Sequence, residues 1–238
     1  MHHLRNKRIS FDENSHTYYV DSSQVSQSVT QFVSQFFKEF DTHEVIEKWY
    51  SYWQSNENSK YYAMAKEEIS TYWKKTGDDA RDRGTQIHRA IEEYELLGKM
   101  SQSREFEQYL EFKKESNIQI LGIEWRIFDE ELDIAGTVDC IAKDNSSGEI
   151  YIFDWKRVKE IKETSPDNAL YPLEHLANSN YWKYALQLNM YKYILEKHYN
   201  MKISGTYLVQ LHDELEEFNK VKVVNMEYEI QKMVRYTN

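Results

Sequence analysis

The sequence contains little cysteine, proline or glycine: one Cys, two Pro and seven Gly stand among its 238 residues. Because Cys140 has no second cysteine to pair with, an intramolecular disulfide scaffold is excluded. The low glycine and proline counts exclude collagen-like and low-complexity chains. No apolar run approaches the ~20 residues of a membrane-spanning helix, and the first residues carry too few apolar side chains for a secretory signal peptide. We therefore predict a soluble, cytoplasmic protein of a reducing compartment, with no membrane partner.

Positive charge is also scarce, since 30 Lys and Arg stand against 40 Asp and Glu, which gives a net charge of −10. Proteins that bind nucleic acid without sequence preference usually present a basic face. The overall charge therefore argues against broad nucleic-acid binding, but it leaves room for a local basic groove or a bound cation. At roughly 100–200 residues per domain, the chain has the length of one domain with additions or of two small ones.

Hydrophobic periodicity predicts a mixed α/β (α+β) chain. A hairpin is predicted at 9–20, and two or three amphipathic helices are predicted in the aromatic, charged stretch 41–76. Runs rich in Ile, Val and aromatic residues, together with a turn signal at 143–148, predict an antiparallel meander of strands at 121–128, 134–142 and 150–155. The remaining predicted elements are helices at 78–97, 106–112, 181–199 and 226–236 and strands at 205–212 and 221–225. This order predicts a mixed central sheet flanked by helices.

Acidic residues lie within two of the predicted strands. Asp154 stands in the last strand of the meander, and Lys156 shares its face because strand side chains alternate. Asp139 stands in the preceding strand, so the two carboxylates are predicted to lie close together and to repel. A divalent cation with oxygen ligands would remove that cost, whereas a plain ion pair between Asp154 and Lys156 is the alternative. Gly136 suits a bend or the close approach of a backbone.

Two predicted helices carry polar residues one turn apart. His88 and Glu92 are four residues apart and share a helix face, and so do Gln187 and Tyr191. A structural histidine, and an amphipathic helix whose tyrosine packs on the sheet, are the alternative interpretations. Gly84 lowers the stability of a helix, which predicts close packing or the approach of another group at that point.

These residues form four motifs in order: Gly-Thr-Gln-Ile-His ending at His88, Gly-Thr-Val-Asp ending at Asp139, Asp-Trp-Lys at 154–156, and Gln-x-x-x-Tyr from Gln187 to Tyr191. In this order and spacing, residues 80–200 resemble the RecB-like branch of the PD-(D/E)XK nuclease superfamily. The opening of the chain, at 16–21 and 28–30, is similar to that of nucleases of the mitochondrial genome maintenance exonuclease type and their phage and viral relatives. Val138 stands at the position of Pro in the superfamily name. The second acidic position, which the name gives as Asp or Glu, is Asp154 in this chain.

The resemblance implies a restriction-endonuclease-like nuclease core at 79–238, preceded at 1–78 by a hairpin and a helical subdomain that could form an arch over single strands. It implies a phosphodiester hydrolase that uses one or two Mg²⁺ or Mn²⁺ ions. The implied catalytic residues are Asp139, Asp154 and Lys156. The implied metal ligands are His88, Asp139, Asp154 and the backbone carbonyl of Trp155, with Glu92 as a further candidate. The implied DNA contacts are Arg83, Thr85, Arg157, Gln187 and Tyr191.

Other charged and aromatic residues have two interpretations each. Glu124, like Glu92, is a candidate for a second metal or for orienting a ligand, and the alternative for Glu124 is a solvated strand face. Basic residues around the predicted site form either a local phosphate track or a solvated face: Arg81, Arg83, Arg89, Arg157, Lys159 and Lys162. The aromatic residues of 49–73 are either base-stacking platforms or the core of a helical subdomain.

The sequence therefore predicts a metal-dependent DNA exonuclease that prefers single strands or free ends and acts in replication, recombination or repair. One alternative is a non-catalytic nucleic-acid-binding or assembly module that retains the fold, against which the intact Asp139, Asp154 and Lys156 argue. Another is a nuclease subunit that depends on a separate helicase, and a single-strand-binding protein is a further candidate partner. Because the chain has no Gly-x-x-x-x-Gly-Lys phosphate loop, any motor would be another protein.

Overall fold

The computed structural model describes residues 3–237 and divides the chain into two units. The first unit joins Met1–Lys38 to Ile87–Asn238, and the second is Glu39–Gln86. The boundary at residue 78 that the sequence suggests lies inside helix α3 (Lys66–Leu97). Each unit has its own hydrophobic core.

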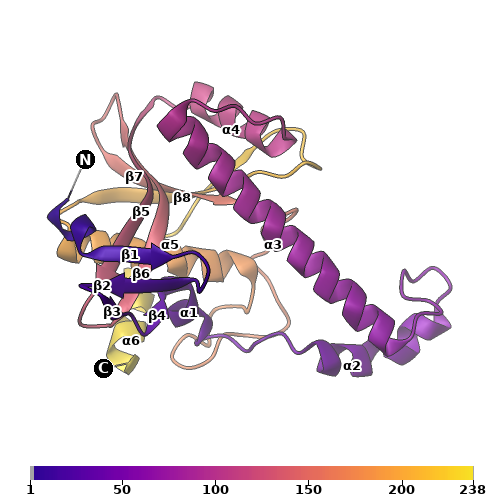
Figure 1. The fold of residues 1–238 in the computed structure, drawn as a ribbon. Coiled ribbons are helices and arrows are strands. Elements are labelled where there is room, and N and C mark those ends of the chain that lie inside the picture. The colour runs from indigo at the N-terminus through magenta and orange to yellow at the C-terminus, as the bar shows by residue number, and fades with distance from the viewer. Residues whose placement is uncertain (1–2, 238) are drawn as a thin grey trace. The chain divides into compact units, whose positions relative to one another are not determined.

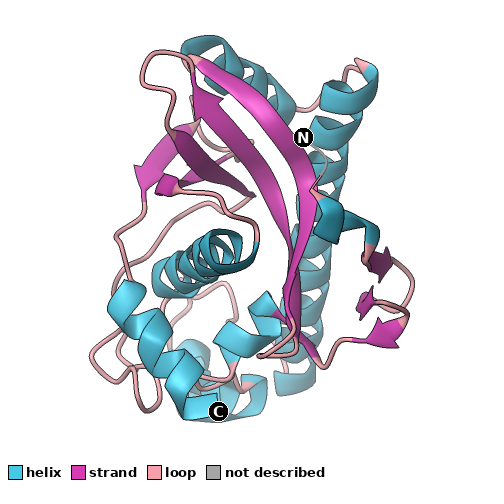
Figure 2. Cartoon of the chain, turned by 90° about the vertical axis from the view of Figure 1, so that its left-hand side faces the viewer, coloured by secondary structure: helices cyan, strands magenta, loops and turns pink. Residues whose placement is uncertain are grey.

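A six-stranded mixed sheet lies at the centre of the first unit (Figures 1 and 2). Its strand order is β4-β6-β7-β8-β9, and β5 also pairs with β6. Strands β5, β6 and β7 are antiparallel neighbours, which confirms the predicted meander, whereas β4 runs parallel to β6 and β8 runs parallel to β7. The strands are β4 Gln27–Ser28, β5 Ile118–Asp129, β6 Ile134–Asp144, β7 Ile150–Lys156, β8 Ile203–Gln210 and β9 Asn219–Lys222.

Helices pack on both faces of this sheet because its strands carry apolar side chains on both faces (Figure 2). One core contains Val138 of β6 and Leu188 of α5. The other contains Trp155 of β7 and Phe112 of α4, whose ring centroids are 5.5 Å apart. The predicted fold class, a mixed sheet flanked by helices, is therefore confirmed. The helices of this unit besides the end of α3 are α1 Val29–Ser34, α4 Arg104–Glu115, α5 Asn180–His198 and α6 Glu227–Thr237.

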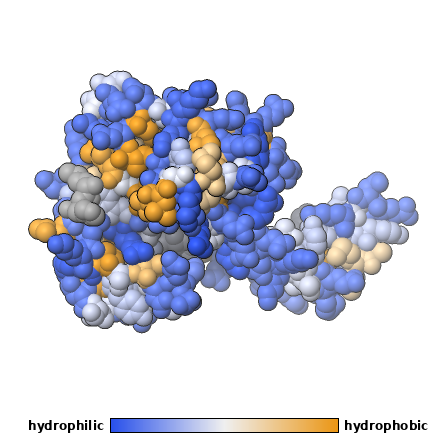
Figure 3. All heavy atoms as spheres, turned by 45° about the horizontal axis from the view of Figure 1, so that its top comes forward, coloured by the Kyte–Doolittle hydropathy of each residue, from blue (hydrophilic) through white to orange (hydrophobic). Residues whose placement is uncertain are grey.

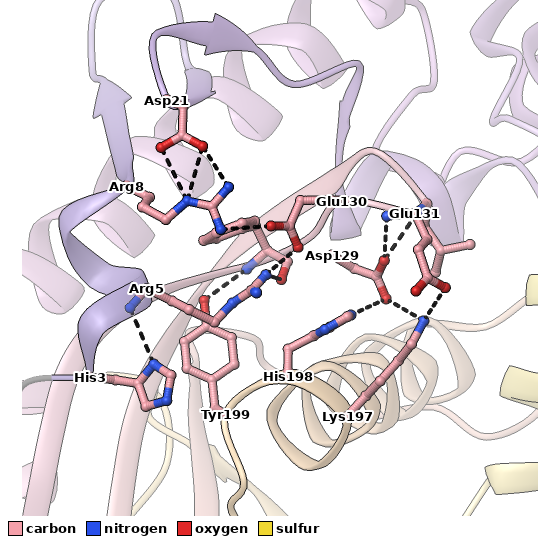
Figure 4. A network of polar contacts seen from close by, with 12 residues as sticks. His3, Arg5, Arg8, Asp21, Asp129, Glu130, Glu131, Lys197, His198 and Tyr199 are labelled. Atoms are coloured by element: carbon pink, nitrogen blue, oxygen red, sulfur yellow. Dashed lines mark hydrogen bonds and ion pairs between the residues drawn. The ribbon is translucent and has the colours of Figure 1, made fainter.

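The predicted N-terminal hairpin is also confirmed. A short 3-10 helix, η1, precedes a three-stranded antiparallel sheet, and these elements are η1 Leu4–Lys7, β1 Ile9–Asp12, β2 Thr17–Val20 and β3 Ser23–Gln24. Ion pairs join this sheet to the end of β5 (Figure 4). Arg8 binds both Asp21 and Glu130, with 2.8 Å between its Nη1 and Glu130 Oε1. Arg5 donates to the Phe128 carbonyl at 3.2 Å. The hairpin is thereby held beside β5 and β6.

The second unit has a small aromatic core. Helix α2 (Thr42–Ser55) begins after Asp41, whose side chain accepts a hydrogen bond from a backbone amide of the first turn. Tyr61 and Ile69 are buried in this core, and the Trp73 indole donates a 2.7 Å hydrogen bond to the Tyr61 hydroxyl. The aromatic stretch predicted as amphipathic helices thus supplies α2 and the start of α3.

Hydrophilic side chains cover most of the face that Figure 3 views, and hydrophobic side chains form scattered spots among them. Isolated exposed apolar residues are usual on soluble domains and need no special explanation. Within residues 3–237, no helix has the length and apolarity to cross a membrane.

Candidate active site

Three potential metal ligands from different elements meet at one side of the sheet. They are His88 of α3, Glu124 of β5 and Asp139 of β6, and one ligand atom of each lies within 4.8 Å of the other two. His88 Nδ1 is 3.5 Å from Glu124 Oε1 and 3.5 Å from Asp139 Oδ2. An imidazole and two carboxylates at this spacing form a donor set that suits Mg²⁺ or Mn²⁺. The residues present therefore fit a divalent cation.

Glu124 enters this group through an unusual backbone conformation. Its φ angle is +45° within strand β5, where left-handed geometry is rare for a residue with a side chain. Ile123 pairs with Cys140 and Trp125 pairs with Val138, so Glu124 lies across from Asp139 without joining the ladder. Such strained positions are concentrated at functional sites. Glu124 therefore lies in the group of converging ligands, with 26% of its side chain exposed, rather than on a fully solvated strand face, and its backbone conformation left no signal in the sequence.

Asp154 and Lys156 form a buried ion pair at the end of β7. Lys156 Nζ is 2.6 Å from Asp154 Oδ2, and only 2% of the Asp154 side chain is exposed. Burial raises the pKa of Asp154 to about 6, although attraction by Lys156 opposes that rise. Burial would lower the pKa of Lys156, but the nearby Asp154 and Asp139 outweigh it and raise the pKa, so the ammonium remains protonated. Among residues 3–237, Asp154 does not belong to the group of three ligands that converge.

The backbone of Trp155 connects Asp139 to His88. Its amide donates a 2.8 Å hydrogen bond to Asp139 Oδ2, and its carbonyl accepts one of 2.9 Å from His88 Nε2. The carbonyl predicted as a backbone ligand thus lies at the site. Burial would lower the pKa of His88, but Asp139 and Glu124 outweigh burial and raise it to about 9. Without a cation, a protonated His88 therefore offsets the two carboxylates.

The Gln187 and Tyr191 pair on α5 lies behind the acids. Gln187 Nε2 donates to the Tyr191 hydroxyl at 3.0 Å and to Thr30 Oγ1 at 3.1 Å. Tyr191 is only 3% exposed, and its ring occupies the space where a side chain at Gly136 would lie. The close approach that Gly136 permits is therefore that of a tyrosine ring rather than of a backbone. Tyr191 is thus buried against Gly136 of the strand that carries Asp139, and DNA contacts by Gln187 and Tyr191 stay predictions.

Arg157 is held by two acidic residues. Its side chain is 6% exposed, and its guanidinium forms ion pairs of 2.7 Å with Glu105 and with Asp213. Arg157 thereby joins α4 to the loop after β8, and these carboxylates would compete with a phosphate for the guanidinium, so a DNA contact by Arg157 stays a prediction.

Three further predicted site residues lie on α3. Glu92 is not part of the group of converging ligands within residues 3–237, and Glu124 contributes a carboxylate instead. In the second unit, Thr85 is exposed and its hydroxyl donates to the Arg81 carbonyl at 3.2 Å. Arg83 is exposed in the same unit. A Cβ built on Gly84 would meet no described heavy atom within 4 Å, so close packing does not explain this glycine, and the approach of another group stays a prediction. DNA contacts by Arg83 and Thr85 stay predictions.

The family described as the PD-(D/E)XK nuclease superfamily matches residues 41–237, which is well over half of the chain. A search of the curated proteins finds no match. The matched range contains His88, Glu124, Asp139 and the Asp154–Lys156 pair.

Proposed function

The chain belongs to the PD-(D/E)XK nuclease superfamily, and from this premise we propose that it is a metal-dependent DNA exonuclease that prefers single strands or free ends. The observation that carries the proposal is the meeting of His88, Glu124 and Asp139 beside the buried Asp154–Lys156 pair. The separation of these residues along the chain makes their convergence a property of the fold. A binding module that retained only the fold would have no use for this charged group.

We assign Mg²⁺ or Mn²⁺, as one or two ions, to this group of residues. His88, Glu124 and Asp139 would hold the cation, and Asp154 and the Trp155 carbonyl stand beside them. A bound divalent cation polarises a phosphodiester and lowers the pKa of water. Cation binding requires a neutral imidazole, so His88 would give up the proton that it holds in the absence of metal.

Lys156 is the residue that we assign to the reacting phosphate. Its ammonium remains protonated and is held by Asp154 Oδ2 at 2.6 Å. A compact positive charge at that position stabilises the negative charge that develops on the phosphate oxygens. Asp154 fixes the position of the ammonium, and both side chains are largely shielded from water, which strengthens the interaction.

The preference for single strands rests on the exposed aromatic residues of the second unit. Trp49 and Tyr52 of α2 are 45% and 57% exposed. A third exposed ring of this unit, Tyr72, lies near a lysine: the Lys60 ammonium is 5.7 Å from its centre. Aromatic platforms next to cations bind unpaired bases with about 1–3 kcal/mol per stacked base. This unit would therefore hold a single strand by stacking, as the predicted arch requires.

The four ordered motifs support a place in the RecB-like branch, and with it a role in replication, recombination or repair. A helicase or a single-strand-binding protein is the partner that would supply single strands, since the chain has no phosphate loop of its own. The alternative of a non-catalytic module predicts DNA binding without cleavage in any metal.

The deciding experiment uses end-labelled single-stranded, blunt duplex and circular single-stranded DNA, with Mg²⁺, Mn²⁺ or EDTA. We expect metal-dependent release of label from linear single strands, slower release from blunt duplex and no cleavage of circles. Lys156→Ala should abolish cleavage, whereas Lys159→Ala, a change at an exposed lysine paired with Glu214, should retain it. Cleavage of circles would refute the exonuclease assignment. Equal rates on single strands and duplex would refute the strand preference, and DNA binding without cleavage in every metal would favour the module.

A further inference from the structure

Arg126 lies next to the group of converging ligands on the same strand. It follows Glu124 by two residues on β5, about 7 Å along the strand. Trp125 between them packs into the core on the α5 face, so the Arg126 side chain points to the opposite face. In the ladder Arg126 pairs with Thr137, which precedes Asp139 by two residues on β6. Arg126 is exposed.

The N-terminal hairpin forms one wall of this position. The Tyr18 hydroxyl of β2 is 2.9 Å from Thr137 Oγ1. Burial raises the pKa of Tyr18, the Thr137 hydrogen bond lowers it, and smaller effects come from Glu124, Arg126 and Asp139. Because Thr137 is the ladder partner of Arg126 and contacts the Tyr18 hydroxyl, the phenol lies next to the position of Arg126 on the sheet.

Basic side chains elsewhere around the site are already paired. Arg89 contacts Glu93 at 3.2 Å, Lys162 contacts Glu160 at 3.2 Å, and Lys159 pairs with Glu214. Arg157 is buried between two acids. By contrast, within residues 3–237 no carboxylate lies within ion-pair distance of Arg126, although the protein carries a net charge of −10. An arginine kept unpaired beside acids is available to an anion from outside the protein.

We propose that Arg126 binds the backbone phosphate next to the one that is cut, with Tyr18 as the wall that limits its movement. This inference rests on the proposed function, because it names a contact of the same site with its substrate. The planar guanidinium offers paired donors that match two phosphate oxygens. The contact is independent of base identity, so it would position a strand of any sequence against the ligand group. It would also add a second positive charge to that of Lys156 at the site of an acidic protein.

The first test measures the binding of a fluorescein-labelled single-stranded oligonucleotide by anisotropy. The Lys156→Ala protein serves as background, so that the DNA stays intact in the presence of Mg²⁺. Adding Arg126→Gln should weaken binding about tenfold, the effect expected for a charge-assisted hydrogen bond. The slope of log K against log salt should become shallower by about 0.7, one phosphate contact on a single strand. Arg235→Gln, at an exposed arginine of α6, should change neither quantity.

The second test locates the phosphate. Each linkage of the oligonucleotide is replaced in turn by an uncharged methylphosphonate, and binding is compared with and without Arg126→Gln. We expect the effect of Arg126→Gln to vanish at one linkage only, the neighbour of the bond that the unmodified protein cuts. Equal loss of affinity for Arg126→Gln and Arg235→Gln, or an Arg126→Gln effect that persists at every linkage, would overturn the proposal. If the unmodified protein cut no DNA in any metal, the proposed function would fail, whereas the binding scan would still decide the role of Arg126.

Discussion

The ring of Tyr191 lies directly against Gly136: a Cβ atom built on Gly136 would come within 2.7 Å of Tyr191 Cε1 and within 3.3 Å of Val29 Cγ2. Real Cβ atoms essentially never show a contact as short as the 2.7 Å to Tyr191 Cε1, so only glycine fits while the ring keeps its place. Two of the four motifs are thereby linked by packing, since Gly136 belongs to the strand of Asp139 and Tyr191 belongs to α5. The glycine makes room for the tyrosine that supports the acids from behind.

Gly136→Ala should therefore destabilise the protein. Forcing one more carbon into this packed position costs about 1–3 kcal/mol, which urea denaturation would measure. Gly84→Ala is the matched control, because a Cβ there meets no described atom and alanine favours the helix by about 0.5–1 kcal/mol. The control should gain stability. A Gly136→Ala protein as stable as the parent would show that the Tyr191 ring does not lie against Gly136.

Glu124→Gln should weaken the binding of Mn²⁺, as isothermal titration calorimetry would show. Replacing even an outer partner of a metal ligand typically costs about 10–100-fold in affinity, so loss of a ligand carboxylate should cost about tenfold or more. Glu92→Gln tests Glu92, the further candidate ligand of the sequence analysis. We expect it to leave Mn²⁺ affinity unchanged because Glu92 lies outside the converging group. The opposite order of effects would mean that the wrong glutamate has been assigned.

Tyr184→Leu should slow catalysis by displacing Lys156. The Lys156 ammonium lies 5.0 Å from the centre of the Tyr184 ring, a cation–π contact that helps to orient it. We expect kcat to fall about tenfold with KM unchanged, and Tyr184→Phe to retain most activity because the ring remains.

Tyr193→Leu is the matched control for this variant. Tyr193 is also on α5, and Lys197 lies 5.3 Å from its ring centre. Lys197 pairs with Asp129 and Glu131, which do not belong to the ligand group. Its kcat should match that of the parent protein. A loss of kcat in Tyr193→Leu as large as in Tyr184→Leu would indicate a general effect on α5 rather than positioning of Lys156.

Asp129 should make folding stability depend on pH. Its buried carboxylate contacts His198 Nε2 at 2.8 Å and Lys197 Nζ at 3.1 Å and accepts a hydrogen bond from the Leu132 amide (Figure 4). Burial would raise the pKa of Asp129, but these contacts outweigh it and lower the pKa below its usual value. A lowered pKa contributes stability that is complete above about pH 4 and is lost as the pH falls through the folded-state value.

Asp129→Asn should therefore cost about 3 kcal/mol at pH 7, because His198 would lose its carboxylate partner and Lys197 would keep only Glu131. The difference from the parent should shrink as the pH falls below the lowered folded-state pKa of Asp129, where both side chains are neutral. Urea denaturation at several pH values would measure this. A difference that stays constant with pH would show that the lost contacts are steric rather than ionic.

Several features of this protein were determined by local sequence. Runs rich in Ile, Val and aromatic residues at 121–128, 134–142 and 150–155 and the turn signal between the last two are enough to define the meander, because strand pairing across a short turn is a local property. The order of the motifs likewise placed His88, Asp139 and Lys156 on the correct helix and strands. Residue type and spacing carry this information without knowledge of the rest of the fold.

The tertiary structure decided which of these residues share a site. Glu124 joins His88 and Asp139 only because β5 takes a left-handed residue opposite Asp139, which no residue type in that strand encodes. Arg157 and Tyr191 are polar residues whose types suggest contact with DNA, yet both are buried, one between acids and one against Gly136. Sequence spacing determines the face of an element on which a side chain lies. Exposure and charge pairing depend on what the remaining chain packs against that face, so only the assembled fold sets them.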